Sequence, residues 1–103
     1  MPEYELTVLA EKDLKSIARY TIDKWGLQQA KRYETLLANR FQQIAQGRIT
    51  TPRVFLDHRQ DLLFTRCEHH YIFYCTRESQ CPLILAVFHE RMDLMQRLKN
   101  RLA

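Results

Sequence analysis

Side chains that can move a proton or hold an anion follow the last long apolar segment of the chain. Leu83 to Phe88 is an uninterrupted apolar run, and His89-Glu90-Arg91 comes directly after it. An imidazole and a carboxylate can exchange protons, and a guanidinium can bind a phosphate or a carboxylate. Because rigid strand ends hold such groups in fixed positions, this tripeptide is the first candidate site.

The elements that must position this tripeptide are β-strands. An apolar run of this kind, bounded upstream by Cys81-Pro82, predicts a strand that is buried on both faces of a sheet. Residues 62–66 and 71–76 bracket Glu68-His69-His70, which is typical of a hairpin. A turn over residues 77–81 then leads into the apolar run. We therefore expect a three-stranded antiparallel meander in the second half of the chain.

The first half predicts a strand and two helices. Residues 3–8 alternate between polar and apolar side chains, which indicates a half-buried strand. From Ala10 the apolar spacing changes to three and four residues, and Gly26 and Gly47 end two helices at about residues 10–25 and 28–46. The short link at Gly26 predicts an antiparallel helical hairpin, with Trp25 and Tyr33 in its core.

Two segments leave alternatives open. Val54-Phe55-Leu56, within the irregular residues 47–61, is either a short strand or a plug over the core. A last helix, at about residues 92–102, carries one apolar face made of Met92, Met95, Leu98 and Leu102. That face either packs on the sheet or forms a groove that a partner covers. The expected fold is α+β in the order β-α-α-β-β-β-α, and residues 1–103 are expected to form a single domain.

The charge and composition limit the partners of the chain. Its 103 residues carry a formal net charge of +4, and the charged residues are spread evenly along the sequence. No basic block is present, so we expect no direct nucleic-acid binding without a partner protein. The positive field of the chain favours an acidic partner. The apolar runs are too short for a membrane-spanning helix, and the N-terminus does not resemble a signal peptide. We expect a soluble, cytoplasmic protein with no membrane partner.

The three cysteines predict packed, reduced thiols. Cys67, Cys75 and Cys81 cannot all pair within one chain, which is typical of a reducing compartment. A zinc site can be drawn from Cys67, His69, His70 and Cys75, but the spacing contains no C-x-x-C knuckle. We therefore expect neither a metal nor another cofactor.

Three segments carry a resemblance to a known family. Leu9-Ala10-Glu11-Lys12-Asp13-Leu14 with Ile17 and Tyr20, followed by Trp25-Gly26, Gln29-Ala30 and Tyr33, resembles the helical hairpin of the ParE branch of the ParE/RelE toxin superfamily. Residues 84–93 resemble the last strand of that branch and its exit, and residues 70–74 are similar to its penultimate strand. The likeness covers nearly the whole chain and is poor over residues 47–61.

The resemblance implies a toxin of a type II toxin–antitoxin pair. Such a toxin is neutralised by a small antitoxin, ParD-like or of another kind, whose disordered arm folds across it. Members of the ParE branch poison DNA gyrase, whereas members of the RelE branch cleave mRNA on the ribosome. The resemblance therefore implies two alternative mechanisms for this chain.

The residues favour gyrase poisoning over mRNA cleavage. RNA cleavage without a metal needs a base, an acid and cations for the phosphorane. The chain has no lysine between Lys31 and Lys99 and no tyrosine after Tyr74, so it lacks a complete set. The nuclease alternative retains only His89 as acid or base, with Arg66 and Arg91 as phosphate clamps. We expect a toxin that acts by protein interaction and has no catalytic residues.

Six residues are the candidate partner contacts. They combine cations with adaptable apolar groups near the sheet end and on the last helix: Arg59, Arg66, Arg91, Met92, Met95 and Leu98.

A third alternative keeps the toxin scaffold without the toxin activity, because a fold does not determine a function. The chain would then be a small basic binding module.

Overall fold

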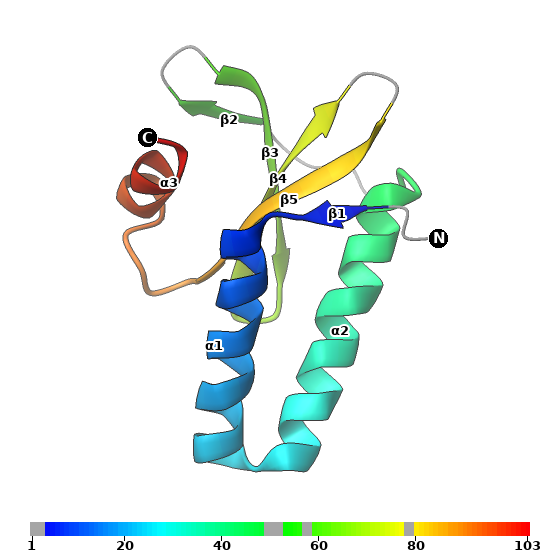
Figure 1. The fold of residues 1–103 in the computed structure, drawn as a ribbon, viewed down its shortest axis with the longest axis vertical. Coiled ribbons are helices and arrows are strands. Elements are labelled where there is room, and N and C mark those ends of the chain that lie inside the picture. The colour runs from blue at the N-terminus through cyan, green and yellow to red at the C-terminus, as the bar shows by residue number, and fades with distance from the viewer. Residues whose placement is uncertain (1–3, 49–52, 57–58, 78–79) are drawn as a thin grey trace.

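A helical hairpin, a five-stranded sheet and a short C-terminal helix make up the fold (Figure 1). The computed structural model describes residues 4–48, 53–56, 59–77 and 80–103. Its elements are, in chain order, β1 (Glu5–Leu6), α1 (Val8–Trp25), α2 (Leu27–Ala45), β2 (Arg53–Leu56), β3 (Arg59–Cys67), β4 (His70–Arg77), β5 (Gln80–His89) and α3 (Leu94–Leu102).

The sheet has the strand order β1-β5-β4-β3-β2. Strand β1 pairs with β5 in parallel, and all other neighbours are antiparallel. The predicted α+β fold, with its N-terminal strand, helical hairpin, meander and last helix, is confirmed. Val54-Phe55-Leu56, which was open between a strand and a plug, belongs to β2 and pairs with β3 at the edge of the sheet.

Local capping explains why the first helix begins earlier than its apolar period indicates. The Thr7 hydroxyl accepts a hydrogen bond from the Ala10 amide at 3.0 Å, as an N-cap does. The Thr7 amide donates to the Ile84 carbonyl at 3.1 Å, so the same residue ends the pairing of β1 with β5. At the other end of α1, Gly26 adopts a φ of +93°, which favours glycine and lets the chain reverse into α2.

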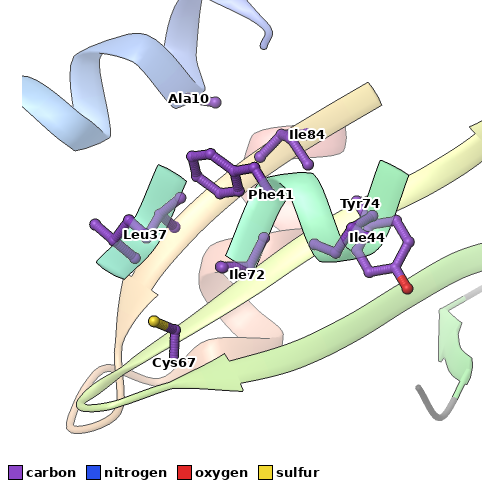
Figure 2. Packing of buried hydrophobic residues seen from close by; sticks show 9 residues of the cluster. Ala10, Leu37, Phe41, Ile44, Cys67, Ile72, Tyr74 and Ile84 are labelled. Carbon is purple, nitrogen blue, oxygen red and sulfur yellow. The ribbon is translucent and has the colours of Figure 1, made fainter. Parts of the chain in front are cut away.

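Both faces of the sheet are buried, as the uninterrupted apolar run predicts. The helical hairpin covers one face, and Figure 2 shows the α2 side chains of that core facing β4 and β5. This first core cluster consists of Ala10, Leu37, Phe41, Ile44, Cys67, Ile72, Tyr74, Ile84 and Val87. The second cluster lies on the opposite face, under α3, and consists of Leu62, Phe73, Cys75, Leu85, Ala86, Phe88 and Leu98.

The last helix packs on the sheet, which decides between the two alternatives for its apolar face. Leu98 is 0% exposed in the second cluster, with Leu94 and Leu102 packed beside it. Met92 and Met95 are 40% and 43% exposed, so neither belongs to the packed face. The helix begins at Leu94 and not at Met92, because the Asp93 carboxylate accepts from the Gln96 amide and caps it.

The prediction that Trp25 lies in the core is wrong. Trp25 is the last residue of α1, at the tip of the helical hairpin, and its side chain is 71% exposed. The tip extends past the end of the described sheet (Figure 1). Tyr33 is half-buried and packs against the first cluster, as predicted for the helical core.

A bulge in β5 brings backbone groups to side chains of both terminal helices. The pairing of β4 with β5 moves from Phe73 opposite Ala86 to Tyr74 opposite Ile84, so Leu85 is the additional residue. The Leu85 carbonyl accepts from the Arg101 guanidinium at 3.0 Å.

Asp13 completes this contact from the other side. Its Oδ2 accepts from the Val87 amide at 3.0 Å. Both of its carboxylate oxygens accept from Arg101, each at 2.9 Å. The part of β5 that lies beyond β1 is therefore closed by side chains of α1 and α3 and not by another strand.

Two of the three cysteines lie on opposite faces of the sheet. Cys67 belongs to the first core cluster and Cys75 to the second, at 3% and 4% exposure. The zinc site that combines Cys67 with Cys75 is therefore not assembled. Within the described ranges, no helix is long and apolar enough to cross a membrane.

We predict that Asp13→Ala lowers the free energy of unfolding by about 3 kcal/mol, because it leaves the largely buried Arg101 guanidinium without its partner. Urea denaturation at pH 7 measures this change. The control is Asp23→Ala on the exposed surface of the same helix, which should change stability by less than about 0.5 kcal/mol. Equal losses in the two variants would show that the pair does not hold the helices to β5.

Candidate functional site

The candidate site lies at one end of the sheet, beside the tip of the helical hairpin. His70, the first residue of β4, pairs with His89, the last residue of β5. Glu68 and His69 form the turn between β3 and β4, and the Glu90 amide donates to the His69 carbonyl at 2.9 Å. The exit of β5 is therefore fixed to the β3–β4 turn.

An ion-pair network covers this end of the sheet. Arg66 of β3 forms a salt bridge with Glu90 and donates through Nε to the Glu68 carbonyl at 2.9 Å. The second carboxylate oxygen of Glu90 lies 3.3 Å from His69 Nδ1. Burial opposes the charge of Glu90, but the His69 hydrogen bond and the Arg66 charge outweigh it and lower the pKa of that carboxyl. Both Arg66 and Glu90 are thus engaged with each other.

Tyr33 connects the helical hairpin to the same strands. Its hydroxyl lies 2.5 Å from His70 Nδ1 and 3.2 Å from the Cys67 carbonyl oxygen. If His70 carries its proton on Nδ1, Tyr33 accepts from the imidazole and donates to the carbonyl, and both bonds are satisfied.

Burial determines the charge states of this pair. It raises the pKa of Tyr33 to about 12. Burial, together with the neighbouring His89 and His69, lowers the pKa of His70 to about 4. Both groups are therefore neutral at pH 7, so neither is poised to exchange a proton under physiological conditions.

His89 is oriented by the chain that follows it. The Arg91 amide donates to His89 Nδ1 at 3.1 Å, so proton exchange with a ligand would have to use Nε2. The rings of His70 and His89 meet edge to face, with centroids 5.2 Å apart. The site therefore contains one imidazole held by α2 and a second held by the exit of β5.

Two hollows lie on either side of these imidazoles. The larger, of about 440 Å³, is lined by Tyr20, Trp25 and Gln29 from the hairpin and by His69, His89 and Arg91 from the sheet end. The smaller, of about 240 Å³, lies toward α3 and includes Met92 and Arg97 in its wall. His70 and His89 line both hollows.

Some of the predicted site residues meet here and others do not. Arg66, His89 and Arg91 lie at this end of the sheet, and the half-exposed Met92 follows at the exit of β5. Met95 lies on the outer surface of α3. The prediction that Leu98 contacts a partner is wrong, because Leu98 is a fully buried core residue and has no surface to offer a partner. The side chain of Arg59 lies outside the described part of the chain.

Sequence reasoning missed four residues of the site. His69 and His70 were considered only for the hairpin and for a zinc site that was not expected, and Tyr33 and Trp25 only for the core. The useful signal was the polar end of Tyr33, since a buried tyrosine hydroxyl usually has a hydrogen-bond partner. No pattern in the sequence indicated that this partner is His70, 37 residues away.

The chain is similar to toxins of a type II toxin–antitoxin system. A family model described as ParE toxin of the type II toxin–antitoxin system parDE matches residues 4–94. A protein named Toxin ParE from Escherichia coli is 42% identical over 105 residues, which cover 99% of this chain and 98% of that protein. A solved chain of the chromosomal ParDE toxin–antitoxin system from P. aeruginosa shares the fold, with a TM-score of 0.70 over 84% of this chain and 92% of that one, at 13% identity.

The fold and these matches define the class of the chain as a toxin of a type II toxin–antitoxin system. Within this class it belongs to the ParE family. The resemblance seen in the helical hairpin and in the exit of the last strand is thereby confirmed. The alternative of a binding module that has only the scaffold of a toxin is wrong.

The lowered pKa of His70 predicts a loss of stability in acid. The ordinary pKa of histidine is 6.5 and that of folded His70 is about 4, so unfolding takes up a proton between these two pH values. Stability should therefore fall as the pH falls from 6.5 towards 4. We expect His70→Gln to remove about 1.5 kcal/mol of the difference in unfolding free energy between pH 7 and pH 4.5, after allowance for solvent screening.

Urea denaturation at the two pH values measures this difference. His69→Gln is the matched control, since it makes the same change at the neighbouring exposed residue and should retain the acid loss. An unchanged pH dependence in His70→Gln would mean that His70 does not titrate with folding.

Proposed function

We propose that this ParE-family toxin poisons DNA gyrase in the cytoplasm, that residues 1–103 act as one toxin domain, and that a ParD-like antitoxin neutralises it. Membership of the ParE family supports the gyrase target. The observation that carries the proposal over mRNA cleavage is the engagement of Arg66 with Glu90 and with the Glu68 carbonyl. These bonds engage Nε and one terminal nitrogen of Arg66, so a phosphate would compete with Glu90 for this guanidinium.

The other hydrogen-bonding groups of the site, which include Tyr33 and His70 beside the predicted His89, support the same reading. Tyr33 and His70 are neutral at pH 7 and bonded to each other. His89 uses Nδ1 for the Arg91 amide. An acid–base pair with pKa values near neutrality, which RNA cleavage requires, is therefore not formed by Tyr33 and His70.

We assign the target contact to the exit of β5 and the outer surface of α3. Arg91 is exposed and fixed at the strand end, while Met92 and Met95 are half-exposed beside it. This surface combines a cation with adaptable apolar side chains on a rigid support, as protein contacts often do. Arg66 borders it but is already paired with Glu90.

We assign the antitoxin arm to the helical hairpin and the sheet beside it. A hollow of about 290 Å³ lies between α1, α2 and β1, and most of its lining is apolar, including Leu14, Ala18 and Leu37. An amphipathic helix binds such a groove through its apolar side chains. The net charge of +4 favours an acidic arm and makes binding sensitive to salt.

We predict that Ala18→Arg weakens antitoxin binding about 100-fold, because the long charged side chain enters the apolar hollow. Calorimetry with the product of the neighbouring reading frame measures the affinity. Asn39→Arg adds the same side chain at an exposed position of α2 that does not line the hollow, and it should change the affinity less than threefold. Absence of binding between the unmodified partners at low salt would contradict the antitoxin assignment.

We predict that Arg91→Ala reduces the accumulation of gyrase–DNA cleavage complexes about tenfold, since one fixed cation of the target contact is lost. Its stability and antitoxin affinity should stay unchanged, because the Arg91 side chain is exposed. His89→Ala is the comparison and should retain at least half of the activity.

The assay pairs gyrase supercoiling and cleavage with degradation of mRNA on translating ribosomes. Loss of toxicity in His89→Ala, together with mRNA cleavage by the unmodified chain, would move the assignment to the RelE-like nuclease. Toxicity without an effect on gyrase would also contradict the proposal.

A further inference from the structure

The two hollows beside His70 and His89 lie next to each other along one end of the molecule. They share these two imidazoles, so together they extend from Trp25 at the hairpin tip to Arg97 on α3. We call this combined feature the end groove and define it by Tyr20, Trp25, Gln29, His89, Arg91 and Arg97. The antitoxin hollow adjoins it and shares Ile17, Thr21 and Tyr33 with its walls, whereas Met95 does not line it.

The cations of the end groove are not neutralised within the described part of the chain. Arg66 pairs with Glu90 and Arg101 pairs with Asp13, so the two acids that line the hollows are already engaged. The side chains of Arg91 and Arg97 make no ion pair with any described residue. The end groove therefore presents two available guanidinium groups, one in each hollow.

Aromatic rings stand beside these cations. Trp25 is 71% exposed and Tyr20 is 58% exposed, which is unusual for large aromatic side chains of a small protein. Both line the larger hollow together with the Gln29 amide. Flat exposed rings stack on nucleobases, an amide can bond to a base edge, and arginine binds phosphate.

We propose that the end groove binds a single-stranded segment of nucleic acid, with one base stacked on Trp25 or Tyr20 and the adjoining phosphates at Arg91 and Arg97. Stacking on these rings needs unpaired bases, which a single strand offers and a duplex does not. An acidic peptide would use the two cations but leave the aromatic rings without a stacking partner. The even charge of the sequence led us to expect no direct nucleic-acid binding, because local placement of Arg91 and Arg97 is not visible in a charge count.

This inference goes beyond gyrase poisoning and does not depend on it, because the test uses only the chain and an oligonucleotide. Trp25 is the single tryptophan of the protein, so its fluorescence reports directly on the end groove. Titration with oligothymidine or oligouridine of about ten nucleotides should quench this fluorescence in a saturable manner. The two oligomers distinguish a DNA segment from an RNA segment.

The salt dependence measures the number of phosphate contacts. Two contacts should give a slope of log Kd against log salt of about 1.4, because each contact with a single strand contributes about 0.7. In the double variant Arg91→Ala/Arg97→Ala, the Kd should rise at least tenfold and the slope should approach zero. The control Lys12→Ala/Arg48→Ala also removes two exposed charges, but outside the hollows, and should change the Kd less than threefold.

Stacking is tested with Trp25→Leu, using anisotropy of a labelled oligomer in place of tryptophan fluorescence. Its Kd should rise about tenfold. All substituted side chains are exposed, and urea denaturation of each variant checks that the fold is kept.

Four results would overturn the proposal. They are an absence of saturable quenching at low salt, equal binding of a duplex of the same length, equal binding of polyglutamate, and an equal loss in the Lys12→Ala/Arg48→Ala control. Binding of polyglutamate or of the antitoxin arm in preference to the oligomers would assign the end groove to a protein partner. Arg91 belongs to both proposals, whereas Trp25 lies outside the assigned target contact, so Trp25→Leu in the two assays distinguishes the failure of one proposal from the failure of the other.

Discussion

The pair between Asp13 and Arg101 joins the three layers of the molecule. Asp13 comes from α1, Arg101 from α3, and both bond to the backbone of β5 between them. The two residues are 88 positions apart in the sequence, so the bond closes nearly the whole chain. Among the described residues β1 pairs with β5 at Leu83 and Ile84, and Asp13 supplies the partner of the Val87 amide in the next part of that strand. Strand β5 and the helices α1 and α3 therefore share one polar anchor.

The position of the site follows from this anchor. Strand β5 carries its exit residues to the point where the helical hairpin and α3 both border the sheet, and the Glu90 amide fixes that exit to the β3–β4 turn. Tyr33 adds a bond from α2 to β4. Side chains from four separate segments thus meet at the end of a sheet that is held by contacts outside the site. A rigid support of this kind holds an interaction surface in a fixed shape.

Periodicity predicted the elements well because each one has an amphipathic or fully apolar pattern of its own. The run from Leu83 to Phe88 is buried as expected, and the spacing of the helical hairpin gave its two helices. The apolar spacing could not place Trp25. The spacing of α1 continues to the hairpin tip, although the described sheet ends before the tip. It also could not show that Leu98 lies in the core while Met95 faces outward, since both have the same apolar character. The contacts of His70 with Tyr33 and His89 depend on strand register, which short apolar segments leave undetermined.

The bulge at Leu85 also affects how the sheet can grow. Exposed strand edges recruit further strands, and proteins protect them to avoid aggregation and exchange of segments between copies. On the β1 side, a further strand could pair with β5 only by displacing the Asp13 carboxylate and the Arg101 guanidinium from Val87 and Leu85. The β2 edge lies on the opposite side of the described sheet, so a strand that paired there would leave this polar closure intact.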